Sequence, residues 1–255
     1  MKYEICLHSR KYQTGVQIRR IIVAIRKTLL IKNRGNLMWI QYWQSVQLSI
    51  TVTIAASVVV IIAGTLLGYL FARKAFKFKI IVETIMMLPL VLPPSVIGFL
   101  LIIIFGNQSF IGDLIKVIFG QSIMFTWYAA VIAASVVAFP LMFQTAKAGF
   151  LNIQKGIEEA AIDLGANPRQ VFARVSLPLA KKALIAGCVL SSARALGEFG
   201  ATLMFAGNIP GVTQTVPTAI YMAIDNGDML LAWAWVITMV LLSFFLLYFV
   251  RSKEN

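Results

Sequence analysis

Long stretches without any charged residue alternate with short charged segments along this chain. Four of them hold 38, 29, 30 and 22 residues, and they lie between Arg34 and Arg73, Glu83 and Asp113, Lys116 and Lys147, and Asp228 and Arg251. A helix needs about 20 apolar residues to cross the hydrocarbon core of a bilayer. The pattern predicts five membrane-spanning helices, at roughly residues 46–72, 80–105, 123–150, 183–205 and 229–250.

The composition agrees with this interpretation. Of the 255 residues, 59% are hydrophobic and 13% are charged, whereas a soluble domain carries about 25% charged residues. A soluble domain with this pattern would have to bury several helices of membrane-spanning length, which argues against that class. We therefore expect an all-α, polytopic helical bundle in a lipid bilayer.

Basic residues gather on one side of the predicted membrane. The net charge of +13 would suggest nucleic acid as a partner in a soluble protein, but here these residues fall between spans, so no such partner is predicted. Twelve Lys and Arg lie on one side, whereas the other side, counted from Trp39, has only Lys116. Because basic residues favour cytoplasmic loops, the first side and the C-terminus are predicted to be cytoplasmic.

Residues that could carry out catalysis or bind metal are scarce. The one histidine is His8, and Cys6 and Cys188 are isolated, so no metal site or disulfide is predicted. The chain has no Gly-x-x-x-x-Gly-Lys-Ser/Thr phosphate loop and no Gly-x-Ser-x-Gly nucleophile elbow. We expect no catalytic residue and no cofactor.

The second predicted span contains Pro89, Pro93 and Pro94. Two adjacent prolines remove backbone donors and kink a helix. A membrane tolerates such a break where neighbouring helices or water satisfy the freed carbonyls. This span is therefore expected to face the protein interior, and a packing role and a role in a transport pathway both stay open.

The connection between the third and fourth spans, residues 151–182, has a distinctive spacing. It reads Glu159-Ala160-Ala161, three residues, Gly165, nine residues, Val175, one residue, and Leu177-Pro178. Acidic residues suit the first turn of a helix over 157–164, and Gly165 suits the left-handed turn at its end. Asn167-Pro168 can open a second short helix, which Leu177-Pro178 is expected to end. Two short helices at a sharp angle are predicted.

This spacing resembles the EAA loop of ABC-importer permeases, with Val175 where that family usually has isoleucine. The run Ala193–Thr202 and its continuation to Pro217 look like the molybdate permeases, as do Leu88–Pro94 with Gly98, and the sulfate permeases are nearer cousins than other importers. The resemblance covers about residues 39–251.

The resemblance implies the type I ABC-importer permease fold and a place in the bacterial cytoplasmic membrane. It further implies a homodimer with the translocation path at its interface, two cytoplasmic ATPase subunits that bind ATP, and an external oxyanion-binding protein. The loop with Glu159, Ala160, Ala161, Gly165, Leu177 and Pro178 would dock into the ATPase. The implied function is ATP-driven import of molybdate, with sulfate or tungstate as alternatives, because the binding protein normally selects the oxyanion.

Two other classes of membrane protein fit the sequence less well. A stand-alone secondary transporter often shows two related halves, yet no internal repeat is found here, and such a carrier has no use for an ATPase-docking loop. A regulatory or scaffolding membrane protein would not explain the proline-broken span or a basic residue in the middle of another span.

That residue is Arg194, which lies four positions before Glu198 and therefore on the same helix face. An arginine at mid-bilayer costs about 2.5–3.5 kcal/mol, so it should be paired and should face inward. An Arg194–Glu198 ion pair that locks the helix in the bundle and a positive element near an anion path are both open. Glu83 could reach the membrane surface or pair across helices.

The segment before the first span is different in character. Residues 1–37 hold nine basic residues and one acidic residue, yet five spans with a cytoplasmic C-terminus would place them outside. We expect the working protein to begin at Met38, which makes residues 38–255 the permease domain. The alternatives are an interfacial amphipathic helix over 16–32 or a sixth element that brings the segment inside.

Overall fold

The computed structural model describes the backbone of residues 2–251 and the side chains of residues 38–248 except those at 119 and 155. Two compact units can be distinguished, Met1–Trp43 and Gln44–Asn255; the sites below lie in the second. The described backbone contains helices and no strand, so the predicted all-α class is confirmed. The interpretations of residues 1–37 fall outside the described side chains and stay predictions.

The helices follow one another as α1 (Lys2–Arg73), α2 (Lys79–Val91), α3 (Pro94–Phe105), α4 (Phe110–Phe119), α5 (Trp127–Leu151), α6 (Lys155–Asp163), α7 (Pro168–Val171), the π-helical turn η1 (Phe172–Ser176), α8 (Leu177–Leu179), α9 (Lys181–Leu196), α10 (Gly200–Phe205), α11 (Val216–Asp225) and α12 (Met229–Arg251). Among the described residues three segments are long and apolar enough to cross a membrane: Met38–Arg73, Trp127–Leu151 and Met229–Tyr248. Two bent pairs, Pro94–Phe105 with Phe110–Ile118 and Pro168–Leu179 with Lys181–Leu196, raise the number to as many as five. The number agrees with the five spans expected, but neither pair includes α2, which the second predicted span contained.

The second span is interrupted rather than kinked. Helix α2 ends at Val91, Leu92 is extended (ψ 142°), and Pro94 is the first residue of α3. Proline suits a first helical position because its missing donor has no helical partner there. Within the single chain α3 buries Ile97, Gly98 and Leu101, whereas none of the α2 residues is buried. The expectation that this span faces the protein interior fits α3; for α2 it concerns the surfaces of other subunits and stays a prediction.

The third and fourth spans also differ from the prediction. Helix α5 begins at Trp127 rather than at residue 123, because Thr126 caps it by accepting the Ala129 N–H. Helix α9 ends at Leu196, and the chain becomes helical again only at Gly200. Helices α4 and α11 were not predicted.

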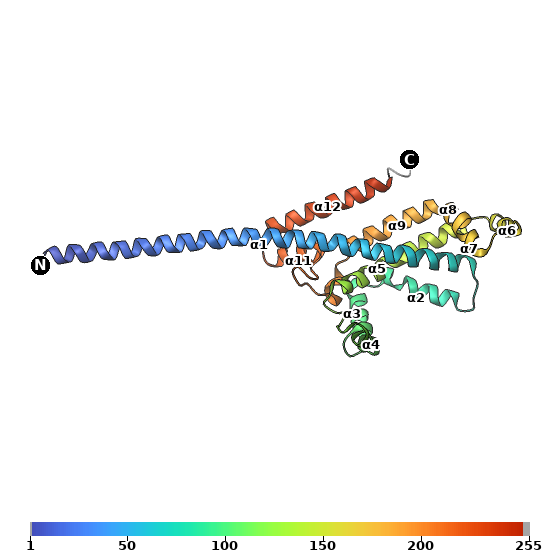
Figure 1. Cartoon of the computed structure of the whole chain (residues 1–255), viewed down its shortest axis with the longest axis horizontal. Coiled ribbons are helices and arrows are strands. Elements are labelled where there is room, and N and C mark those ends of the chain that lie inside the picture. Colours follow the sequence, from blue (N-terminus) through green and yellow to red (C-terminus); the bar gives the residue numbers. More distant parts are fainter. Residues whose placement is uncertain (1, 252–255) are drawn as a thin grey trace. The chain divides into compact units, whose positions relative to one another are not determined.

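Helix α5 is the central helix of the second unit. Its buried side chains are mostly small, and it runs beside α9 (Figure 1). A Cβ added at Gly149 of α5 would lie 2.5 Å from Cβ of Ala183 on α9, and one added at Gly68 of α1 would lie 2.8 Å from Cβ of Ala146 on α5. Such close approach through small residues is how helices associate in membranes, where the hydrophobic effect does not drive contact.

Helices α6, α7 and α8 gather at the end where the chain leaves α5 (Figure 1). Residues 155–179, which comprise these three helices and η1, form a compact projection that we call the knob. The knob continues into α9 after one residue, Ala180. The chain bends by 74° there, between the segments Pro168–Leu179 and Lys181–Leu196.

Candidate functional site

The first half of the knob has the predicted turn. Helix α6 carries Glu159 and Ala160, which are exposed, and Ala161, which is half-buried. After Leu164 the chain turns at Gly165, whose φ of +90° lies in the left-handed region. The Gly165 N–H donates to Ile162 O at 2.8 Å, and the Ala166 N–H donates to Ala161 O at 3.0 Å. Glycine adopts this conformation without the cost that a Cβ adds.

The second short helix starts where it was predicted to start. Asn167 accepts the Gln170 N–H at 2.9 Å, and the Gln170 side chain accepts the Asn167 N–H at 2.9 Å. This reciprocal arrangement is a capping box, and Pro168 occupies the first helical position.

The second short helix ends within one residue of Leu177-Pro178, as predicted. The chain passes from α7 through η1, stays helical as far as Leu179, and begins the next helix at Lys181. In a regular α-helix a proline ring clashes with the carbonyl four residues earlier, and the π-helical turn changes the spacing just before Pro178. Leu177 and Pro178 are both exposed on the knob.

The outer surface of the knob is partly apolar. Leu164 is 89% exposed, and Ile157 and Ile162 are exposed as well. Leu177 instead lines a cleft with residues of α1, α5 and α9, such as Ile61 and Met142. Exposed apolar residues outside an apolar span are typical of surfaces that bind other proteins.

The inner side of the knob holds a residue that the sequence did not single out. Glu158 is buried, next to the exposed Glu159, and it forms an ion pair with Arg73 at the end of α1. The two are 85 positions apart. Nothing in the local pattern pairs them, because the acid at 158 and the one at 159 look alike in the sequence.

A second ion pair joins α2 to α5. Glu83 pairs with Lys147, and the two side chains are 22% and 18% exposed. Of the two possibilities left open for Glu83, the structure has the pair across helices. It involves no residue of the knob.

The structure brings Arg194 and Glu198 together. Nη1 of Arg194 lies 2.7 Å from Oε2 of Glu198, whose side chain is 1% exposed. The other carboxylate oxygen accepts the Ala201 N–H at 2.8 Å, so Glu198 also caps the start of α10. Arg194 is 30% exposed. Oε1 of Glu198 thus accepts a hydrogen bond and Oε2 lies in the ion pair, while part of the Arg194 side chain stays accessible.

The broken second and fourth spans pack against each other. A Cβ added at Gly200 of α10 would lie 2.9 Å from Cβ of Pro94, and one added at Gly98 of α3 would lie 2.5 Å from Cβ of Met204. The proline break at Pro93-Pro94 thus lies beside the chain segment that follows Glu198. Pro89 lies within α2 and is half-buried.

Buried polar residues tie the loop before α11 to α1. The Val216 N–H donates to Ser49 Oγ at 2.7 Å, and Ser45 Oγ donates to Gln214 Oε1 at 3.3 Å. Gln214 and the neighbouring Thr213 and Thr215 are buried. The Thr213–Pro217 stretch is therefore attached to α1 by buried hydrogen bonds.

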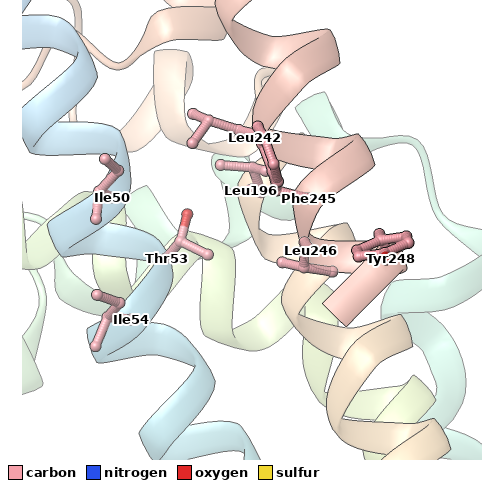
Figure 2. Close-up of a pocket in the computed structure, with 8 residues that line it drawn as sticks. All are labelled: Ile50, Thr53, Ile54, Leu196, Leu242, Phe245, Leu246 and Tyr248. Carbon is pink, nitrogen blue, oxygen red and sulfur yellow. The ribbon is translucent and has the colours of Figure 1, made fainter. Parts of the chain in front are cut away.

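An apolar cleft of about 580 Å³ lies between α1, α9 and α12. Figure 2 shows its lining: Ile50, Thr53, Ile54, Leu196, Leu242, Phe245, Leu246 and Tyr248. Only Thr53 and Tyr248 bring polar side-chain atoms to it. This lining contains no cationic group that would attract an oxyanion. Among the described residues no three His, Cys, Asp or Glu side chains come close enough to hold a metal ion.

Comparison with known proteins identifies the chain's relatives. Residues 61–252 match the family described as "Binding-protein-dependent transport system inner membrane component". YvgM of Bacillus subtilis, a permease protein attributed to a molybdenum transport system, is 56% identical over 215 residues, which is 84% of this chain and 95% of YvgM. The molybdenum transport system permease protein ModB of Escherichia coli K12 is 41% identical over 184 residues, 72% of this chain and 80% of ModB.

One solved structure shows the same fold. It is a bacterial alginate ABC transporter in complex with an alginate pentasaccharide-bound periplasmic protein, with a TM-score of 0.69 over 84% of this chain and 78% of that chain. The sequence identity is only 16%, so this likeness concerns the fold alone. The importer-permease fold expected from the sequence is confirmed.

Proposed function

The chain belongs to the binding-protein-dependent transport system inner membrane components, and we propose that it is the membrane-spanning permease subunit of an ATP-driven molybdate importer. The observation that carries the proposal is the knob: a rigid, partly apolar projection at the end of the apolar helices, in a chain that is closely similar to molybdenum permeases. It is a multi-pass membrane protein with no catalytic role of its own.

The knob is the proposed contact with a separate ATPase subunit. Its exposed Ile162 and Leu164 supply apolar contact area, and the Gly165 turn sets the angle between its two short helices. We place the knob and the C-terminus on the cytoplasmic side, because the basic residues accumulate there. The proposed ATPase binds and hydrolyses ATP, and this subunit carries the resulting motion to the spans.

The other proposed partners are a second copy of the chain and an external oxyanion-binding protein. Two copies would enclose the path between them. The accessible part of Arg194 supplies positive charge in an otherwise apolar region, which suits an anion.

Molybdate is favoured over sulfate because YvgM and ModB both carry molybdenum in their names. Tungstate has the same charge and tetrahedral geometry, so the importer is expected to accept it as well. A bacterial strain that lacks the gene should lose cellular molybdenum at low external molybdate and regain it from a plasmid copy. Normal molybdenum content together with impaired sulfate uptake would contradict the molybdate assignment.

A further inference from the structure

The Glu158 carboxylate joins three elements at one point. Nη2 of Arg73, the last residue of α1, donates to Oε1 at 2.8 Å, and Nε of Arg73 lies 2.7 Å from Oε2. Ser176 of η1 donates from Oγ to the same Oε1 at 2.6 Å. The side chains of Arg73 and Glu158 are only 15% and 11% exposed. The carboxylate therefore holds α1, α6 and η1 together.

A second contact follows the same face of α1. Tyr69, four residues before Arg73, packs on Phe172 of η1 with ring centroids 4.7 Å apart, and on Phe150 of α5 at 5.2 Å. Residues four apart share one face of a helix. The last turn of α1 is thus attached to the knob by an ion pair and by an aromatic contact.

The knob is linked through the chain to only two apolar helices. The chain enters it from α5 and leaves it through α8 into α9. Helix α1 ends at Arg73, 85 positions before Glu158, so a displacement of the knob reaches α1 only through non-covalent contacts. The ion pair between Arg73 and Glu158 is the charged contact among them.

We propose that Arg73, Glu158 and Ser176 form a positioning contact that makes the end of α1 move with the knob when an ATPase subunit displaces it. This inference rests on the proposed function. Arg73 makes one charge-assisted hydrogen bond to Glu158, from Nη2 to Oε1, and a second close ion contact, from Nε to Oε2. When such a pair is buried, removal of one partner leaves an uncompensated charge. Such a contact transmits displacement because it resists both sliding and rotation. Glu159, on the outer side of α6, has no part in it.

The chain offers a matched control. Glu83 and Lys147 also form a largely buried ion pair between helices, with comparable exposure. That pair joins α2 to α5 and touches no residue of the knob. Its loss should lower stability as the loss of the Arg73–Glu158 pair does, but it should leave transmission from the knob to α1 intact.

The test compares Arg73→Gln and Glu158→Gln with Glu83→Gln and Lys147→Gln in the complete importer, reconstituted in proteoliposomes with its ATPase and binding protein. The measured quantity is molybdate imported per ATP hydrolysed. We expect this ratio to fall about tenfold in the first two variants, the size of an ordinary coupling between linked sites. The ATPase should still bind, because the outer face of the knob is unchanged. The two control variants should keep the wild-type ratio.

An unchanged ratio in Arg73→Gln and Glu158→Gln overturns the proposal, and so does an equal fall in all four variants, which would report a general loss of stability. If the neutral variants fail to insert, Arg73→Lys decides. It keeps the charge but has one nitrogen where Arg73 brings two to the carboxylate, so a lower ratio with normal insertion supports the contact, and a wild-type ratio contradicts it. A wild-type complex without ATP-dependent uptake would contradict the proposed function instead.

Discussion

Arg194 on α9 and Glu198 just beyond its end form an ion pair of 2.7 Å, in which the carboxylate is buried and the guanidinium group is partly exposed. Because the same carboxylate caps α10 through the Ala201 N–H, the pair stabilises the break between α9 and α10. Part of the Arg194 side chain stays exposed. The structure therefore allows one arginine to hold the helix break and to meet an anion.

The two roles can be separated by substitution. Arg194→Gln should destabilise the protein by about 3–5 kcal/mol if the pair is mainly structural, because it leaves the buried Glu198 carboxylate unpaired. Glu198→Gln should cost less, because Arg194 is 30% exposed and stays partly solvated. The double variant should then recover most of the thermal stability measured in detergent. Arg194→Gln with wild-type stability and no uptake would instead assign Arg194 to the anion path.

Substitution of Gly165 tests whether the turn in the knob is needed for binding of the ATPase. Valine at this position would have to adopt a left-handed conformation, at a cost of about 1–2 kcal/mol. No neighbouring atom lies within 4 Å of the added Cβ, so the effect would arise from the backbone and not from a clash. We expect Gly165→Val to insert normally but to lose co-purification with the ATPase. Asparagine, which tolerates this conformation, should be accepted.

Gly156 provides the control, since it lies in α6, also has open space around it and has no positive φ. Gly156→Val should retain the ATPase. Co-purification of the ATPase with Gly165→Val at the wild-type level would show that the turn does not shape the docking surface.

The contact between α5 and α9 depends on the absence of one methyl group. A Cβ at Gly149 would lie 2.5 Å from Cβ of Ala183, so Gly149→Ala should destabilise by about 1–3 kcal/mol, as overpacking does. Adding Ala183→Gly moves the methyl group across the interface and should restore the melting temperature. Full stability of Gly149→Ala alone would mean that the two helices can separate without cost.

Ser49 supports the start of α11. Its hydroxyl accepts the buried Val216 N–H, and Ser49→Ala should cost about 1–3 kcal/mol because that donor is left without a partner. Thr51→Ala is the comparison, since the Thr51 hydroxyl makes an exposed bond to Gln47 O, and surface changes stay within about 0.5 kcal/mol. Equal melting temperatures for the two variants would show that the Ser49 bond contributes nothing to stability.

The sequence predicted local features better than contacts between residues far apart in the chain. The apolar stretches located the spans, because insertion into a membrane depends on composition within each segment. The helix start at Asn167-Pro168 and the turn at Gly165 are also local, and both predictions are confirmed. The sequence did not predict the break after Leu196, since that break depends on the Glu198 side chain accepting the Ala201 N–H.

Non-local contacts could not be predicted. The sequence did not predict α4, because Asp113 and Lys116 interrupt its apolar pattern. The prolines of the second span predicted a disturbed helix, but not that the break falls at Leu92 or that Pro94 begins a new helix. The Arg73–Glu158 pair joins residues whose separation along the chain gives no indication that they meet.

The central claim is that this chain, with a partner ATPase, imports molybdate at the expense of ATP. The most direct measurement is uptake of radiolabelled molybdate by proteoliposomes that contain the chain, its ATPase and the external binding protein. The account predicts uptake with ATP at the knob side, none with a non-hydrolysable ATP analogue, and none when the binding protein is left out. Uptake by the chain alone, driven by an ion gradient without ATP, would contradict it.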